Sequence, residues 1–80
     1  MSTHSVMDRI QQVFRTELDD DDLVIEPATS QEDIVDWDSL AHVRLVAAIE
    51  REFDIEFELS EIEQIFTVRD FVDGVGRRLP

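Results

Sequence analysis

Apolar residues recur at the 3.6-residue spacing of an α-helix in several stretches of this chain. The spacing predicts three main helices, over about Val6 to Leu18, Ser39 to Phe53 and Val68 to Arg78, and a short helix over about Ser60 to Ile65. One strand-like run, Leu23-Val-Ile25, has no second run to pair with, so a sheet is not expected. The pattern therefore predicts an all-α fold, a small four-helix bundle with a long loop between the first two helices.

Polar residues at the predicted helix starts have the pattern of N-terminal caps. Ser5 and Asp8 are three residues apart at the start of the first helix, as are Thr67 and Asp70 at the start of the last, which is the spacing of a capping box. Ser60 is placed to cap the short helix. We expect these residues to set the helix boundaries.

The segment between the first two helices, Asp19 to Asp38, is about twenty residues long, and loops of this length in compact domains tend to be functional. It begins with the acidic run Asp19 to Asp22, which lacks the ligand pattern and central glycine of a calcium-binding loop and is interpreted as solvated. Ser30 starts a capping-box pattern of its own. Apolar residues along the segment are expected to pin it onto the bundle: Leu23, Val24, Ile25, Ile34 and Val35.

The helix predicted over residues 39–53 has two apolar faces. At 100° per residue, one side is expected to face the core and carries Leu45, Val46, Ile49 and Phe53. A smaller stripe falls roughly opposite, beside two arginines, and consists of Leu40, Val43 and Ala47 next to Arg44 and Arg51. A surface helix needs only one stripe to join a core. The second stripe is therefore a candidate docking surface, although scattered apolar residues on a surface are also normal.

The composition narrows the choice of partners. The net charge is −13 at pH 7, which argues against nucleic acids and anionic membranes, because both are bound by an excess of basic side chains. It favours protein partners with basic patches. The chain has no cysteine, no basic-then-apolar signal at its start, and no apolar run longer than Leu45 to Ile49. We expect a single freestanding domain over residues 1–80, cytoplasmic and monomeric, with no membrane span.

Ser39 stands where the long loop enters the second main helix. Its simplest role is that of an N-cap. A helix N-terminus also stabilises an anion through its free N–H groups and its dipole, so a phosphodiester on Ser39 would lie in a favourable field. Asp38 is placed to help hold a divalent cation during phosphoryl transfer.

His42, three residues after Ser39, raises the question of a nucleophilic Ser–His pair. Such a pair needs a third orienting group and an oxyanion site, and the sequence has no Gly-x-Ser-x-Gly elbow. We therefore expect no enzymatic activity, no catalytic residue and no resident metal. His42 is expected to pack under the long loop.

Ser39 lies in the motif Asp38-Ser39-Leu40, which is followed by Val43, Leu45-Val46, Ile49-Glu50, Glu52-Phe53-Asp54, Ile65 and Thr67-Val68. With these residues at this spacing, the chain resembles the acyl carrier protein family. The resemblance runs ungapped from Asp38 to about Val75 and more loosely over the first helix. Asp-Ser-Leu alone is a weak signal, and the full set is a strong one. The family fold, three main helices and a short one, agrees with the periodicity.

The resemblance implies a carrier and not an enzyme. In the family the serine of this motif, here Ser39, carries a 4′-phosphopantetheine arm delivered from coenzyme A by a Mg²⁺-dependent transferase, a transfer that Asp38 would support. The arm holds an acyl or aminoacyl thioester and presents it to a loading enzyme and a downstream synthase or transferase. The second helix is the family's main recognition surface, which corresponds here to Leu40, Val43, Arg44, Ala47, Glu50 and Arg51. Trp37 is either a further partner contact or a loop anchor.

Two departures from the family pattern bear on the partners. Carriers of fatty-acid synthesis are typically acidic along the second helix, whereas this chain has Arg44 and Arg51 on the outward side. Many members have a glycine three residues before the serine, where this chain has Asp36, followed by Trp37. The expected function is a discrete acyl carrier of secondary-metabolite or specialised lipid biosynthesis. The alternative is an acidic helical interaction module that never receives the arm.

Overall fold

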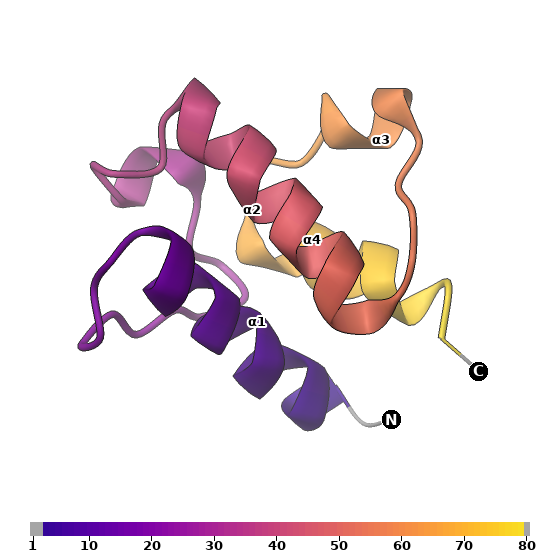
Figure 1. The fold of residues 1–80 in the computed structure, drawn as a ribbon, viewed down its shortest axis with the longest axis horizontal. Helices are drawn as coiled ribbons and strands as arrows, with labels where there is room; N and C mark the ends of the chain where they lie inside the picture. The colour runs from indigo at the N-terminus through magenta and orange to yellow at the C-terminus, as the bar shows by residue number, and fades with distance from the viewer. Residues whose placement is uncertain (1–2, 80) are drawn as a thin grey trace.

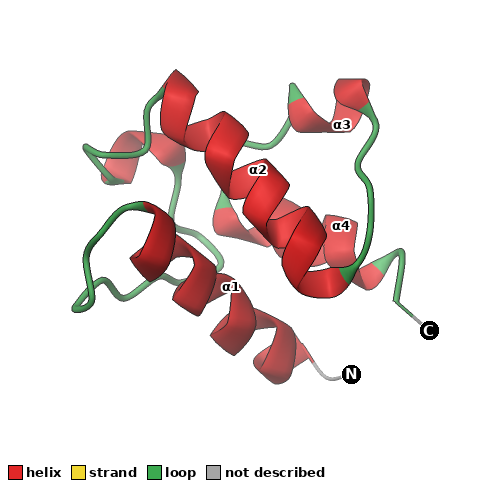
Figure 2. Cartoon of the chain, in the orientation of Figure 1, coloured by secondary structure: helices red, strands yellow, loops and turns green. Residues whose placement is uncertain are grey.

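Three main helices and two short ones make up the fold (Figure 1). The computed structural model describes residues 3–79, and its elements are, in chain order, α1 (Thr3–Glu17), η1 (Gln31–Asp33), α2 (Ser39–Phe53), α3 (Leu59–Ile62) and α4 (Val68–Gly76). Figure 2 shows helices joined by loops and no strand in this range; the one β-type pairing is an isolated bridge between Ser30 and Thr67. The predicted all-α fold with a long loop between α1 and α2 is confirmed.

The bounds of α2 are those that the periodicity predicts. The helix ends because Asp54 adopts a left-handed conformation with φ 55°, and its N–H donates to the carbonyl of Glu50. The start of α4 is also as predicted, since Thr67 Oγ1 accepts the N–H of Asp70 at 3.2 Å while the Asp70 carboxylate accepts the N–H of Thr67 at 3.1 Å. The end of α4, at Gly76, comes two residues before the predicted Arg78.

Two of the predicted helix starts are wrong. Helix α1 already includes Thr3, so Ser5 lies within the helix and does not cap it. Helix α3 starts after Glu58, whose N–H donates to the Glu61 carboxylate at 3.3 Å in a capping box. Because this pair forms the cap, Ser60 lies inside α3, and the helix ends at Ile62 rather than at residue 65.

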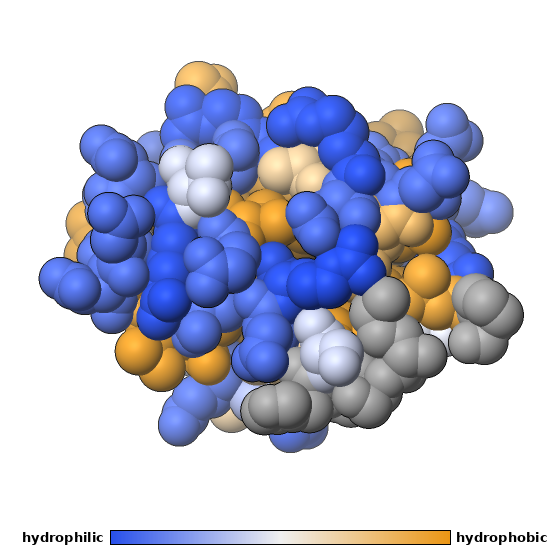
Figure 3. Space-filling model, turned by 60° about the horizontal axis from the view of Figure 1, so that its bottom comes forward, coloured by the Kyte–Doolittle hydropathy of each residue, from blue (hydrophilic) through white to orange (hydrophobic). Residues whose placement is uncertain are grey.

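Apolar side chains of α1, α2 and α4 form the core. At its centre the Phe14 ring meets the Trp37 and Phe71 rings edge to face, with centroids 5.0 and 6.0 Å away. No polar or charged residue is buried among those whose exposure the structure describes, and the face drawn in Figure 3 is mainly hydrophilic. Within residues 3–79, no helix is both long and apolar enough to cross a membrane.

The long loop is fastened to the start of α4. The carbonyl of Thr29 accepts the N–H of Val68 at 2.9 Å. The predicted capping box at Ser30 forms around η1, where the N–H of Ser30 donates to the Asp33 carboxylate at 2.9 Å. The loop is thus an ordered part of the fold, which gives the residues that follow it a defined position at the start of α2.

The apolar residues of the loop divide into two groups. Ile25 is buried in the core, and Leu23 and Ile34 are partly buried against it, as expected. Val24 is 70% exposed and Val35 is 96% exposed, so their predicted role in pinning the loop is wrong. Leu23 to Ile25 alternate as in extended backbone, so Val24 points away from the core. Val35 lies in the turn that is closed by the N–H of Trp37 donating to the carbonyl of Ile34 at 3.1 Å.

Candidate functional site at the start of helix α2

Ser39 is the first residue of α2, and its side chain is exposed. The helix is capped by Asp38, whose Oδ1 accepts the N–H of Ala41 at 2.8 Å and whose carbonyl accepts the N–H of His42 at 2.8 Å. The interpretation of Ser39 as the N-cap is therefore wrong. Because Asp38 performs the capping, the Ser39 hydroxyl is not committed to the helix and stays accessible for chemistry.

The backbone at this helix start can receive an anion. The N–H groups of Ser39 and Leu40 have no hydrogen-bond acceptor within residues 3–79, as expected for the first turn of a helix. These free N–H groups and the helix dipole favour negative charge just outside the N-terminus. An exposed hydroxyl beside free N–H groups fits a phosphodiester on Ser39.

The surroundings of the helix start are acidic. An open hollow beside it is lined by Glu17, Asp19, Asp36 and Asp38, with Arg44 as the basic residue among them. Carboxylates in this number attract cations. Even so, the described residues contain no group of three or more histidine, cysteine, aspartate or glutamate side chains close enough to hold a metal ion.

The buried Trp37 and the partly buried His42 form a hydrogen-bonded bridge behind the site. Trp37 is 2% exposed, and its indole Nε1–H donates to Nδ1 of His42 at 3.0 Å. Since Nδ1 accepts this hydrogen bond, the ring proton is on Nε2, which donates to the carbonyl of Ile62 in α3 at 3.2 Å. Of the two roles left open for Trp37, the loop anchor is correct, and its assignment as a partner contact is wrong because its side chain is covered.

The bridge also bears on His42. Its packing against the loop through Trp37 is as predicted, while its contact with α3 was not expected from the sequence. Both ring nitrogens are engaged, so His42 has no nitrogen left to accept a proton from Ser39. The arrangement is not that of a Ser–His nucleophile.

The two faces predicted for α2 are confirmed. The residues assigned to the core are buried, together with two alanines that the periodicity did not single out: Leu45, Val46, Ile49, Phe53, Ala41 and Ala48. On the opposite face Leu40 is 71% exposed and Val43 is 65% exposed. Arg44 and Arg51 are also exposed, and Ala47 is partly so. The stripe is therefore on the surface beside Ser39.

Glu50 differs from its neighbours on this face. Its side chain is partly buried, and its carboxylate accepts the N–H of Phe57 at 2.8 Å, which ties the loop after α2 back to the helix. This contact gives Glu50 a role within the fold.

A polar cluster that the sequence did not predict joins α3 to the C-terminal end of α4. The Glu61 carboxylate pairs with Arg78 and, at 3.1 Å, with Arg77. The Arg78 guanidinium also donates to the carbonyl of Glu56 at 2.7 Å and lies over the Phe57 ring, 5.0 Å from its centroid. Hydrogen bonding from Arg78 is the main reason that the pKa of the Glu61 carboxyl falls from 4.5 to about 2. No local pattern marks this cluster, because its members are far apart in sequence.

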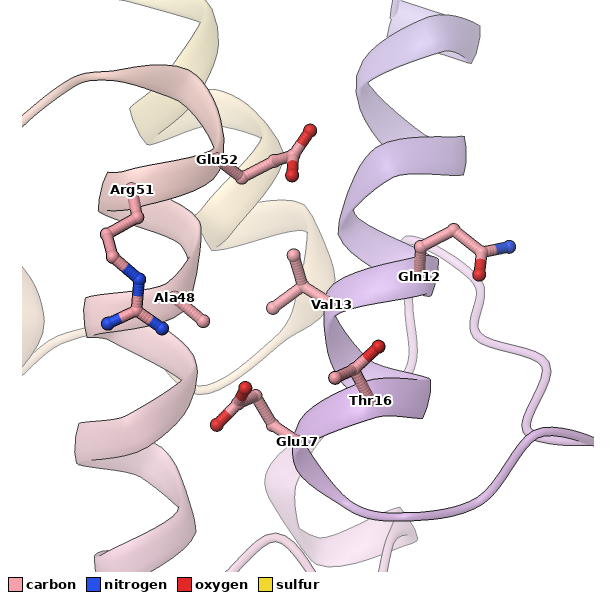
Figure 4. Close-up of a pocket in the computed structure, with 7 residues that line it drawn as sticks. All are labelled: Gln12, Val13, Thr16, Glu17, Ala48, Arg51 and Glu52. Atoms are coloured by element: carbon pink, nitrogen blue, oxygen red, sulfur yellow. The ribbon is translucent and has the colours of Figure 1, made fainter.

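A groove between α1 and α2 is another hollow near the docking stripe (Figure 4). Val13 of α1 and Ala48 of α2 face each other across it, with Arg51 on the α2 side and Glu17 on the α1 side. None of the residues described in this groove belongs to a group of three or more possible metal ligands, and we assign the groove no chemistry.

Three comparisons with known proteins bear on this site. The family model of the phosphopantetheine attachment site matches residues 6–75. The acyl carrier protein of Cyanidioschyzon merolae is 36% identical over 75 residues, covering 94% of this chain and 82% of the relative. The acyl carrier protein of Phenylobacterium zucineum is 38% identical over 74 residues, covering 92% of this chain and 94% of the relative. The solution NMR structure of holo acyl carrier protein from Geobacter metallireducens has a TM-score of 0.83 at 36% identity, and the match covers 90% of this chain and 83% of that one.

The fold is that of a phosphopantetheine-bearing carrier domain. The chain belongs to the acyl carrier protein family. Its cofactor is covalently attached 4′-phosphopantetheine, and it acts as a carrier rather than as an enzyme. These findings favour the carrier over the alternative of an interaction module that never receives the arm.

Proposed function

We propose that Ser39 is the residue that carries the phosphopantetheine arm. The observation that carries this assignment is the division of labour at the helix start: Asp38 caps α2, so that the Ser39 hydroxyl is exposed next to free N–H groups. The residue also lies within the span matched by the family model. Another exposed serine, Ser60, lies inside the four-residue helix α3 and has no such setting.

Asp38 has two tasks in this proposal. One carboxylate oxygen, Oδ1, accepts the N–H of Ala41 and keeps the helix start in place. The other oxygen has no hydrogen-bond donor within residues 3–79, so it is available next to Ser39 for the Mg²⁺ that accompanies coenzyme A in the transferase. The chain holds no complete metal site of its own in the described range, which is consistent with a cation shared with the transferase.

Intact mass tests the assignment. The protein is incubated with coenzyme A, Mg²⁺ and a broad-specificity phosphopantetheinyl transferase. The wild type is expected to gain the mass of one phosphopantetheine, Ser39→Ala to gain none, and the matched control Ser60→Ala to gain as much as the wild type. Absence of a mass gain in the wild type with several transferases, or modification of Ser39→Ala, would overturn the assignment.

The arm would carry an acyl or aminoacyl group as a thioester and present it to partner enzymes. These comprise the transferase, a loading enzyme and a downstream synthase or transferase. We propose that they dock on the outward face of α2 next to the arm, through Leu40, Val43, Arg44, Ala47 and Arg51. The support is the exposure of these side chains beside Ser39. Glu50 contributes through the fold, because its carboxylate holds the N–H of Phe57.

We further propose that the carrier serves secondary-metabolite or specialised lipid biosynthesis rather than ordinary fatty-acid synthesis. The support is the pair of exposed arginines, Arg44 and Arg51, on a helix that is typically acidic in fatty-acid carriers. The test offers the holo protein to a malonyl-loading enzyme of fatty-acid synthesis. We expect slow loading that improves in the double variant Arg44→Glu, Arg51→Glu. Fast loading of the wild type would contradict this assignment and leave the Ser39 proposal untouched.

A further inference from the structure

The seven basic side chains of the protein are all arginines, and they fall into two groups. Four of them bind within the chain. Arg9 pairs with Glu52 at 2.7 Å, Arg15 donates to the carbonyl of Leu23 at 2.7 Å, and Arg77 and Arg78 both pair with Glu61. For the side chains of Arg44, Arg51 and Arg69 the structure shows no hydrogen bond, ion pair or ring contact within residues 3–79.

Two of these three unengaged arginines share one line along the outward face of α2. Arg44 and Arg51 are seven residues apart, which is two turns of helix and about 10 Å along its axis. The apolar stripe of Leu40, Val43 and Ala47 runs beside them. Arg69 lies on α4 instead. The face next to Ser39 thus offers an apolar strip with two guanidinium groups at a set spacing.

No ion pair joins either arginine to the carboxylates around it within residues 3–79. Glu17, Asp36 and Asp38 line the hollow beside Arg44, and Glu17 and Glu52 line the groove beside Arg51. Glu52 is paired with Arg9, and the Glu50 carboxylate accepts the N–H of Phe57. A guanidinium without a partner is ready for a bidentate carboxylate pair, which gives geometric specificity as well as energy.

We infer that the partner docking on α2 presents two carboxylates about 10 Å apart along an apolar strip. The inference rests on the proposed use of α2 as the docking face and names the chemistry of the partner. It reverses the expectation from the net charge of −13, which favours basic partners. At physiological ionic strength the Debye length is about 8 Å, so that distant charges are screened and the local arginines decide which surface fits.

A designed peptide tests the inference without the natural partner. The probe is a helical peptide with two glutamates seven residues apart and leucine and alanine along the strip between them. The comparison peptide has lysines in place of the glutamates. Each is titrated to millimolar concentration into the ¹⁵N-labelled protein at physiological salt, and amide shifts are followed by NMR. We expect the glutamate peptide to shift amides of α2 around Leu40, Val43 and Ala47, and the lysine peptide to leave this face unshifted.

Three variants that each remove one positive charge test whether the position of the arginine matters. Arg44→Gln and Arg51→Gln each remove one unengaged arginine from α2, and Arg69→Gln removes one from α4. Each α2 variant is expected to lower the affinity for the glutamate peptide about two- to fivefold, the range of an exposed ion pair. Arg69→Gln is expected to leave this affinity unchanged.

Two results would overturn the inference: no shift of α2 amides with the glutamate peptide, or equal weakening by all three variants. Arm attachment is read separately by intact mass on the same protein samples. Failure of the docking inference is therefore distinct from failure of the Ser39 assignment.

Discussion

Helices α1 and α3 are attached to the rest of the molecule through different contacts. Helix α1 places Val6, Ile10, Val13 and Phe14 in the core. Helix α3 buries no side chain, and its Leu59 is 71% exposed. Apart from the partly buried Ile62, it is held by polar ties, the His42–Ile62 hydrogen bond and the pairing of Glu61 with Arg77 and Arg78.

Two parts of one small domain can therefore have separate stabilities. Truncation of an apolar side chain in the core lowers the free energy of unfolding of the whole domain. Loss of a partly exposed polar tie mainly changes how often the attached segment opens. Substitutions at four sites test whether the two stabilities are separate.

Truncation of the buried ring of Phe71 is expected to have the largest effect. Phe71 is fully buried, and its ring centroid is 6.0 Å from that of Phe14 and 6.1 Å from that of Trp37. Phe71→Ala should lower the free energy of unfolding by about 3–5 kcal/mol, out of a total of about 5–15 kcal/mol for a small domain. Urea unfolding followed by Trp37 fluorescence measures it.

The same change at an exposed phenylalanine is the control. Phe66 is 59% exposed, so Phe66→Ala should cost less than about 0.5 kcal/mol. If Phe71→Ala does not fold, Phe71→Leu replaces it, with an expected loss of about 1 kcal/mol. Equal losses at the two positions would refute the division between core and surface.

Alanine substitutions at the two glycines of α4 are expected to have opposite effects on stability. A Cβ on Gly74 would lie 2.6 Å from Cε1 of Phe57, whereas a Cβ on Gly76 would meet nothing within 4 Å. Gly74→Ala should therefore destabilise the domain by about 1–3 kcal/mol through overpacking. Gly76→Ala should stabilise it by up to about 1 kcal/mol, because alanine is the better helix former. Thermal unfolding distinguishes the two variants. A stabilising effect of Gly74→Ala would show that the Phe57 ring can move aside at little cost.

Loss of the Arg78 contacts is expected to loosen α3 with little effect on the whole domain. Arg78→Gln removes the ion pair with Glu61 and the bond to the carbonyl of Glu56. Because the side chains are partly exposed and their ion pair is screened by solvent, the global free energy of unfolding should fall only slightly. Amide hydrogen exchange in residues 56–63 should accelerate severalfold while that of α1 stays unchanged. Arg69→Gln is the control, and equal acceleration everywhere would contradict separate stabilities.

The smallest expected effect is a pH dependence centred on Glu61. Its pKa of about 2 in the folded protein lies below the ordinary 4.5. As the pH is lowered, the Glu61 carboxylate is therefore protonated in the unfolded chain before it is protonated in the folded one. The ion pair therefore contributes stability above about pH 4.5, and this contribution is lost as the pH falls towards about 2. The difference in unfolding free energy between the wild type and Glu61→Gln should shrink over that range. Glu63→Gln, at an exposed carboxyl, is the control; a difference that stays constant with pH would speak against the Glu61 pair.

The elements that follow local apolar periodicity could be predicted from the sequence. The contacts for which several polar side chains of the chain compete could not. The bounds of α2 follow from its apolar spacing, which involves only residues within a few turns. The cap of α3 could not be placed, because serine is a preferred N-cap residue and glutamate is not, whereas the structure uses Glu58 with Glu61. The Arg78–Glu61 pair spans 17 residues, a separation at which no sequence pattern selects one carboxylate among many.

The site shows the same division. By itself, the sequence determined that Ser39 opens a helix with two apolar faces, because this depends on spacing along one segment. Only the tertiary structure decided that Asp38 takes the cap and exposes the Ser39 hydroxyl, and that Arg44 and Arg51 stay unengaged while Glu52 pairs with Arg9, 43 residues away. The physical reason is that each polar group binds the best-placed partner in space, and the folded chain sets those distances.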